Sequence, residues 1–317
     1  IRDVAVTGVQ TCALPISAEY ASPLVRSTSS AVRLISAGTF QNDYYLTGVE
    51  IQLDPKTITY WRQPGESGAA PNFNFSKSTN VANAEIFFPY PKHIDEADVV
   101  VAGYEGYVVF PVKILPKDPK IPVTLNLAVE YAACSNICLP AKAELSLLLP
   151  QTGSSPFKKL LTEVSAKLPK KIDLAQSKKI FRVERENKGA GWRIIYQGRG
   201  KMVDIFAETN SSVYAETKIS NGIARLNLVA AGISPKSANV IVTIVTSDGA
   251  YEAPVLDQPG HHAVDLVHRD GEADARAGAA GAGDLRVDAD EPAGRIQQRA
   301  AGVAGVDGGI ELGRAHV

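Results

Sequence analysis

Short segments in which apolar and polar residues alternate recur along this chain. In residues 46–54, for example, Val49, Ile51 and Leu53 are separated by glutamate and glutamine side chains. A period of two places the apolar side chains on one face of a β-strand, which can then cover a core. Proline and glycine clusters, such as residues 64–68, separate the segments. Many short strands with such turns predict an antiparallel β-sandwich.

The alternation continues through residues 19–150 and returns in residues 178–255. Besides 46–54, the strands expected in the first region are 107–115, 121–133 and 142–149. Those expected in the second region are 179–185, 191–197, 202–207, 223–229 and 238–246. Asn221 and Gly222 form a dipeptide typical of a hairpin turn. We therefore expect an all-β protein with a β-sandwich at 19–150 and a smaller β domain at 178–255.

One segment between the two β regions has a helical pattern instead. In residues 154–168, Ser155 can cap a helix and Pro156 suits its first position. The apolar residues recur at helical spacing: Phe157, Leu160, Leu161, Val164 and Leu168. We expect this helix, ended by Pro169, to lie in a connector spanning residues 151–177.

Both ends of the chain differ from this body. Residues 6–16, VTGVQTCALPI, match a conceptual translation of a common sequencing-library adapter, and residues 313–317, GRAHV, match its other strand. Residues 252–317 lack Lys, Ser, Thr and Asn, whose codons begin with A or T. We expect residues 1–18 to be adapter-derived and residues 256–317 to be a low-complexity, disordered tail of foreign origin. Cys12 then belongs to the adapter-derived segment, and the body of the chain contains one cysteine pair.

Composition also argues against several kinds of partner and cofactor. The net charge of −1 provides no electrostatic footprint for nucleic acid. No apolar run approaches the roughly 18 residues of a membrane span, so we expect no span in this chain. Four of the five histidines lie in the tail: His261, His262, His268 and His316. We therefore predict neither a metal nor another cofactor.

The chemistry of the body centres on Cys134 and Cys138. They lie between two expected strands, 121–133 and 142–149, and would face each other if those strands pair as a hairpin. A disulfide closing so small a loop removes only about 1–2 kcal/mol of unfolded-state entropy. Spacing alone leaves three alternatives open: a redox-active pair, a structural disulfide, or half of a metal site.

The residues around the cysteines bear on the first of these alternatives. No Lys, Arg or His lies within three residues of either cysteine, and the nearest base in sequence is Lys142. We therefore expect no strongly lowered thiol pKa. Such a pair suits receiving electrons from one partner and passing them to another.

Several motifs resemble a known family. Residues 59–68, TYWRQPGESG, resemble the signature of the N-terminal domain of the thiol:disulfide interchange protein DsbD and its ScsB-like relatives. Gly103 with Tyr104, residues 110–112, and residues 134–140 follow in the family's order. The resemblance covers about residues 30–150, and the helix and second β domain resemble the longer ScsB-like members. The signature's motif residues are Tyr60, Trp61, Pro64, Gly65 and Gly68.

This resemblance implies a fold and a function. The first domain would be an immunoglobulin-like sandwich in the bacterial periplasm, with the native signal peptide replaced by the foreign leader. The cysteine pair would act as a protein-disulfide reductase component. It would take electrons from a membrane-embedded redox domain and hand them to periplasmic thioredoxin-fold proteins, including cytochrome c maturation factors. By analogy with the family, Cys138 would form the mixed disulfide and Cys134 would resolve it.

The resemblance also implies an aromatic cap over the pair. We assign it to a loop at 92–107, with Tyr104, Glu105 and Tyr107 as the candidate side chains. For Tyr60 and Trp61 the simpler interpretation is packing in the core or at a strand end. Gly65 and Gly68 would allow the turn its positive φ angles.

A second function of a different class stays open. The chain could be a non-catalytic periplasmic β-sandwich that serves in binding or assembly, with a structural disulfide between Cys134 and Cys138. The reduction potential of the pair separates the two hypotheses, because inert structural disulfides have potentials below about −300 mV.

Overall fold

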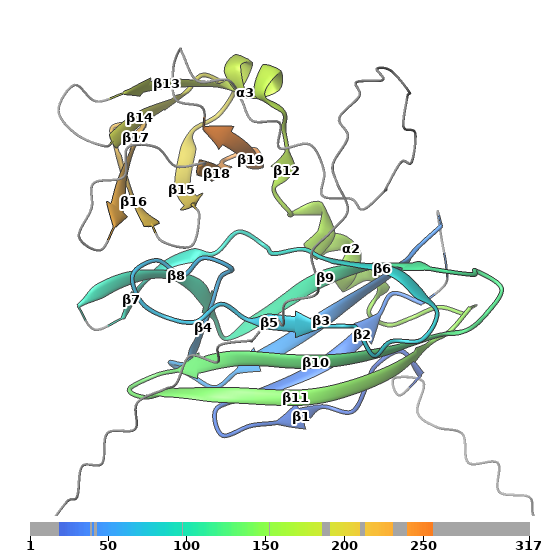
Figure 1. Cartoon of the computed structure of the whole chain (residues 1–317). Coiled ribbons are helices and arrows are strands. Elements are labelled where there is room, and N and C mark those ends of the chain that lie inside the picture. The colour runs from blue at the N-terminus through green and yellow to red at the C-terminus, as the bar shows by residue number, and fades with distance from the viewer. Residues whose placement is uncertain are drawn as a thin grey trace, which may run out of the picture. The chain divides into compact units, whose positions relative to one another are not determined.

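The computed structural model describes residues 19–38, 40, 43–96, 98–151, 153–185, 191–209, 213–230 and 240–255. The segments expected to be adapter-derived or disordered, 1–18 and 256–317, lie outside these described residues. The described residues form two β-sandwiches, joined by a helix-containing connector (Figure 1). No helix in the described part of the chain is long and apolar enough to span a membrane.

The first sandwich has two sheets. One has the order β1-β2-β3-β9-β6, formed by Val25–Arg26, Ser30–Ser36, Tyr45–Leu53, Tyr107–Pro116 and Val81–Ile86. The other has the order β11-β10-β4-β8-β7, formed by Cys138–Leu149, Val123–Cys134, Ile58–Tyr60, Val99–Glu105 and Lys92–Glu96. The short β5, Asn72–Asn74, pairs with β10. All pairings within this sandwich are antiparallel, as the sequence predicts.

Alternating side chains of these strands form the core. In β10, every second residue from Val123 to Tyr131 is buried. In β11, the residues in phase with Leu149 are buried towards the end of the strand. The two strands pair along their whole length, from Val123 opposite Leu149 to Cys134 opposite Cys138. This long hairpin places the cysteine pair at the end of a continuous ladder.

The connector helix is shorter than the sequence predicts. α2 spans Lys158–Ala166, and its buried Leu161 packs with Ile35 and Val109 of the first sandwich. The Ser155 hydroxyl does accept a hydrogen bond from the Phe157 amide at 3.0 Å, and it donates another to the Ser36 carbonyl. Ser155 is bonded to Ser36 of β2, and the regular helix begins at Lys158, two residues later than the expected first position at Pro156.

The second sandwich contains the remaining elements. One sheet has the order β12-β19-β18-β15, formed by Lys170–Lys171, Gly249–Val255, Val240–Thr246 and Met202–Glu208. The other has the order β13-β14-β17-β16, formed by Phe181–Arg185, Gly191–Tyr196, Ile223–Ala230 and Val213–Ser220. Asn221 and Gly222 have φ of 53° and 73° between β16 and β17, which confirms the predicted hairpin turn.

Two segments differ from the sequence-based expectation. Residues 92–107, expected to form a loop, contain the whole of β7 and β8, which pair as a hairpin, and β9 begins at Tyr107. A second helix, α3 at Leu174–Ile180, was not predicted; it has a capping box in which Asp173 and Gln176 bond each other's backbone amides. The strand expected from residue 179 therefore begins at Phe181, because residues 179 and 180 belong to the capped helix.

Candidate functional site

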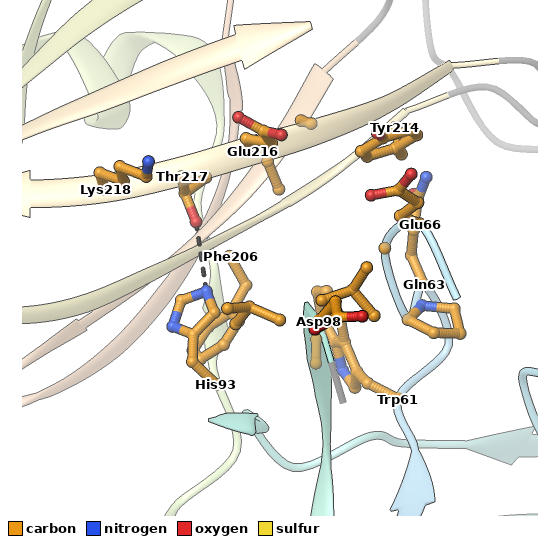
Figure 2. A pocket seen from close by; sticks show the side chains of 17 residues that line it. Trp61, Gln63, Glu66, His93, Asp98, Phe206, Tyr214, Glu216, Thr217 and Lys218 are labelled. Carbon is orange, nitrogen blue, oxygen red and sulfur yellow. Dashed lines mark hydrogen bonds between the residues drawn. The ribbon is translucent and has the colours of Figure 1, made fainter. Parts of the chain in front are cut away.

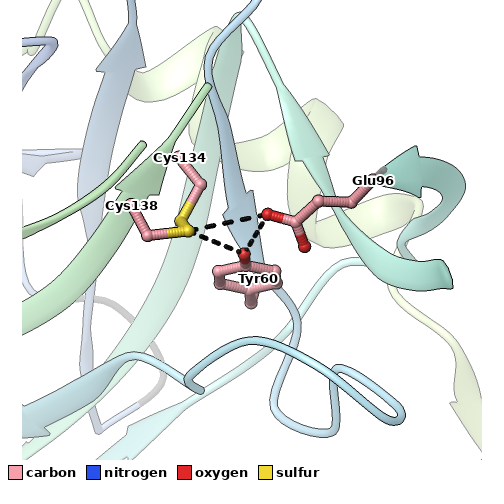
Figure 3. Close-up of a disulfide and its surroundings, with 4 residues drawn as sticks. All are labelled: Tyr60, Glu96, Cys134 and Cys138. Carbon is pink, nitrogen blue, oxygen red and sulfur yellow. Dashed lines mark hydrogen bonds between the residues drawn. A yellow bond between two sulfur atoms is a disulfide. The ribbon is translucent and has the colours of Figure 1, made fainter. Parts of the chain in front are cut away.

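The β10–β11 hairpin brings the two cysteines directly opposite each other. Cys134 and Cys138 are the last paired residues of the ladder, and three residues form the loop between them. Their Cα atoms lie 3.9 Å apart, and the sulfur atoms are joined as a disulfide (Figure 3). The hairpin expected from the sequence thus places the pair at its closed end.

The two cysteines differ sharply in exposure. Cys134 is 1% exposed and packs among Ile58, Tyr60 and Val101. Cys138 is exposed, and its neighbour Ile137 is 71% exposed. A thiolate from another protein can therefore approach the Sγ of Cys138, whereas the Sγ of Cys134 is accessible only to its own partner.

Two polar side chains contact the exposed sulfur. The hydroxyl oxygen of Tyr60 lies 3.4 Å from Cys138 Sγ, and Glu96 Oε1 lies 3.6 Å from it (Figure 3). Tyr60 donates a 2.6 Å hydrogen bond to the same Oε1 atom. The Glu96 carboxylate is therefore held beside the sulfur by a neutral donor rather than by a cation.

The electrostatics of this group follow from its burial. Burial, and then the hydrogen bond and charge of Glu96, raise the pKa of Tyr60 far above its usual value, so the phenol remains a donor. The other carboxylate oxygen, Glu96 Oε2, is buried and has no hydrogen-bond partner among the described residues. In the reduced protein this carboxylate would disfavour a Cys138 thiolate, because like charges repel and a protonated thiol can donate to it.

Strand pairing places both side chains. β4 joins the sheet between β10 and β8, with Ile58 opposite both Cys134 and Glu105. Tyr60 pairs with Gly103, where a Cβ atom would lie 2.5 Å from the Thr59 carbonyl oxygen. A glycine is therefore required at this position for β4 and β8 to pair closely. Their pairing positions Tyr60 beside the disulfide.

The three residues assigned to a cap have their contacts elsewhere. Tyr104 is buried; its hydroxyl donates to the Pro89 carbonyl at 2.7 Å, and its ring packs edge-on against Phe110. Glu105 pairs with Lys92 at 3.2 Å. Burial, and then the neighbouring Glu50, raise the pKa of Tyr107 to about 12. The structure brings Tyr60 and Glu96 to the disulfide instead.

The strand pattern that positions Glu96 was present in the sequence, but the charged residues of the segment made it resemble a loop. In β7, Ile94 and Glu96 are partly buried, while the residues between and before them are exposed. This is a strand alternation, but the run of charged residues resembles a loop. Tyr60 was interpreted as packing, and its fully buried ring fits that, although its hydroxyl also reaches Cys138.

The other signature residues have structural contacts. Trp61 is 1% exposed and belongs to the core. The Pro64 carbonyl accepts from the Ala102 amide at 2.7 Å. Gly65 and Gly68 have φ of 111° and 96°, the positive values expected of them.

The same cluster brings together three residues of types that can bind metal ions. Glu96, Cys134 and Cys138 offer ligand atoms that all lie within 4.8 Å of one another. In the disulfide form, however, the two sulfur atoms are bonded to each other and neither is a thiolate ligand. The arrangement is therefore that of a disulfide with an adjacent carboxylate.

Comparison with known proteins agrees with this geometry. Residues 30–150 match the family model described as thiol:disulfide interchange protein DsbD, N-terminal. A crystal structure of the N-terminal periplasmic domain of ScsB from Proteus mirabilis is similar, with a TM-score of 0.59 and 19% sequence identity. That similarity covers 75% of this chain and 98% of the other, and shows a shared fold. No curated protein matches the chain. Residues 30–150 are therefore similar to a DsbD-type N-terminal domain, and this stretch contains the cysteine pair at the end of the β10–β11 hairpin.

Proposed function

We propose that the Cys134–Cys138 pair carries out thiol–disulfide exchange with other proteins in the periplasm. The observation that carries the proposal is the asymmetry of the pair: Cys138 is exposed, whereas Cys134 is 1% exposed. Exchange needs one sulfur that a partner can reach and a second that can displace the partner afterwards. The family match over residues 30–150 and the ScsB-like fold support the assignment.

The first half-reaction oxidises the pair. In the reduced protein, the Cys138 thiolate attacks one sulfur of a partner's disulfide, forming a mixed disulfide and releasing the partner's other sulfur as a thiolate. The Cys134 thiolate then attacks Cys138 Sγ, which closes the intramolecular disulfide and frees the partner's second sulfur. Two electrons and two protons pass to the partner, which leaves as a dithiol.

The second half-reaction restores the dithiol. A thiolate of an upstream donor attacks the exposed Cys138 Sγ and releases Cys134 as a thiolate. The donor's second thiol then resolves the mixed disulfide and leaves oxidised. We propose a membrane-embedded redox domain as this donor and thioredoxin-fold proteins as acceptors, so that the pair relays reducing equivalents between them. Ladder register favours fast resolution, because Cys134 stays directly opposite Cys138.

The two roles are tested by trapping. Cys134→Ser leaves Cys138 as the attacking thiol without a resolver, so it should accumulate a mixed disulfide with an oxidised thioredoxin-fold protein. Cys138→Ser should accumulate none, because Cys134 is buried. Non-reducing gels and mass spectrometry of the covalent complex provide the measurement. Equal trapping by both variants would contradict the assigned roles.

The reduction potential tests the function as a whole. The oxidised protein is equilibrated with glutathione buffers, and free thiols are alkylated and counted. A potential near that of thiol carriers is expected, whereas one well below about −300 mV would indicate a structural disulfide. A structural disulfide would favour the binding or assembly alternative.

A further inference from the structure

The signature segment around Tyr60 contacts more than the disulfide. Tyr60 touches Cys138, whereas the next side chain, Trp61, packs edge-on against Phe206 of β15, with ring centroids 5.9 Å apart. Gln63 donates to Thr209 Oγ1 at 3.1 Å and accepts from its amide at 2.7 Å. Because neighbouring strand residues point to opposite faces, one short segment joins the disulfide to the second sandwich.

Arg62 makes the strongest of these contacts. Its guanidinium forms a two-bond pair with Glu208, with Nε 2.6 Å from Oε2, and also contacts Glu252. The exposed fractions of the three side chains are 26%, 19% and 14%, so the group is largely shielded from water. Burial opposes the charge of Arg62, but the two carboxylates outweigh it and raise the pKa of Arg62. The guanidinium also lies 4.8 Å from the Trp61 ring centroid.

β7 makes a second connection of the same kind. His93 Nδ1 lies 3.1 Å from Asp204 Oδ1, and its ring stacks on Phe206 with centroids 4.5 Å apart. Figure 2 shows this ring beside Phe206, with its other nitrogen towards Thr217. Glu96 lies three residues along the same strand and therefore on its opposite face, where it meets Cys138.

β7 lies at the edge of its sheet. It is the terminal strand of its sheet and, among the described residues, pairs only with β8. An edge strand held on one side opens more readily than a strand between two neighbours. Contacts between His93 and the second sandwich therefore restrict the strand that carries Glu96.

The interface beside these contacts is not closely filled. A cavity of about 380 Å³ is lined by residues of both sandwiches, including Trp61, Gly65, Val100, Phe206 and Glu216 (Figure 2). Close packing across this region is therefore interrupted. Contacts between the sandwiches include the apolar cluster of Trp61 and Phe206 and the polar contacts of Arg62 and His93.

We propose that Arg62 and His93 are positioning residues for the exchange reaction, tying β4 and β7 to the second sandwich so that Tyr60 and Glu96 stay beside Cys138. The second β domain then sets the chemical environment of the pair from outside the domain that contains it. The inference rests on the proposed function of Cys134 and Cys138. It concerns the thiol pKa and redox equilibrium of the pair and not whether exchange occurs.

Arg62→Met in the full chain tests the proposal, because methionine keeps much of the packing and removes the paired charge. Released from its position, Glu96 would oppose the Cys138 thiolate less. The thiol pKa should then fall, and the equilibrium with glutathione should shift about tenfold towards the reduced form. Simple loss of a nearby cation would move the thiol pKa upwards instead, so the sign of the shift separates the two causes. The readouts are thiolate absorbance against pH and thiol counting in glutathione buffers.

The matched control is Arg33→Met, which breaks another arginine–carboxylate pair, with Glu50, in the other sheet of the first sandwich. It should lower thermal stability while leaving the glutathione equilibrium unchanged. If Arg62→Met fails to fold, His93→Gln, which loosens β7 itself, should produce the same shift. Combining either variant with Glu96→Gln should add no further shift, because the group being positioned is already neutral.

The possible outcomes are distinguishable. A folded Arg62→Met or His93→Gln variant with the wild-type thiol pKa and glutathione equilibrium overturns the positioning role while leaving the exchange function intact. Additive shifts in the Glu96→Gln background overturn it too. A wild-type chain that does not exchange with a thioredoxin-fold protein refutes the proposed function itself.

Discussion

The Tyr60 hydroxyl and the Glu96 carboxylate form a 2.6 Å hydrogen bond directly beside the exposed sulfur of Cys138. The two residues come from different strands, β4 and β7, and neither strand pairs with the other. Their contact places a carboxylate next to the sulfur at which we propose that a partner attacks. Cys138 is thus exposed to solvent on one side, whereas the Glu96 carboxylate lies beside its sulfur on another.

Glu96→Gln should lower the pKa of the Cys138 thiol by about one unit, because it removes a like charge and keeps the shape of the side chain. The reduced form should become correspondingly more favoured in glutathione buffers. Thiolate absorbance of the reduced protein against pH checks the shift. Glu105→Gln, a change at an exposed carboxylate paired with Lys92, should have little effect. An unchanged titration in Glu96→Gln would show that the carboxylate does not act on the sulfur.

Ile137→Asp should weaken recognition of protein partners, because this apolar side chain is 71% exposed in the loop between the cysteines. We expect exchange with a thioredoxin-fold protein to slow about tenfold, the effect of losing an apolar contact at the centre of an interface. Reduction by dithiothreitol should be nearly unaffected. Leu148→Asp, at a 59% exposed position near the other end of β11, is the control. Equal slowing in both variants would point to a general charge effect.

Gly68→Ala should destabilise the first sandwich and disturb Tyr60. An added Cβ would lie 2.4 Å from the Tyr60 ring, and the residue has a φ of 96°. We expect a loss of about 1–3 kcal/mol in the free energy of unfolding, together with faster reduction of the disulfide. Gly222→Ala is the matched control, since its φ of 73° imposes backbone strain with nothing within 4 Å of the added atom. Denaturant unfolding and reduction kinetics measure both effects, and a disulfide that is reduced no faster in Gly68→Ala would argue against the contact.

Stability should fall at high pH, because folding raises the pKa of several tyrosines. Burial dominates the increase for Tyr60, Tyr104 and Tyr107, with Tyr107 reaching about 12. Unfolded tyrosines ionise near pH 10, so between about pH 10 and 12 the unfolded state binds fewer protons and gains stability relative to the fold. The contribution of these tyrosines to stability is fully present below about pH 10 and is lost above it.

Tyr60→Phe should make this alkaline decline shallower, although it lowers stability at neutral pH by removing the donor to Glu96. Denaturant midpoints measured from pH 8 to pH 11 provide the test. Tyr90→Phe, at an exposed tyrosine, should leave the slope unchanged. A slope in Tyr60→Phe equal to that of the wild type would show that Tyr60 does not contribute.

Much of the fold could be predicted because alternation is a local property. The strands predicted at 46–54, 107–115 and 223–229 are observed within one residue at each end, as β3, β9 and β17. The predicted hairpin placed Cys134 and Cys138 opposite each other for the same reason, since two adjacent apolar strands with a short loop can pair in few ways. Boundaries failed where a contact distant in sequence intervened, as when Ser155 bonds Ser36 and shortens α2.

The environment of the disulfide could not be predicted in this way. Tyr60 and Glu96 lie 78 and 42 residues before Cys138, and only the order of strands in the sheet brings them to its sulfur. The contacts of Arg62 with Glu208 and Glu252 likewise depend on how two sandwiches meet. Alternation and spacing were enough to predict several strands, the cysteine pair and the loop between them, because these depend on neighbouring residues. Tertiary structure decided which charge and which hydroxyl act on the pair, because strand order and domain contacts join residues that no local pattern relates.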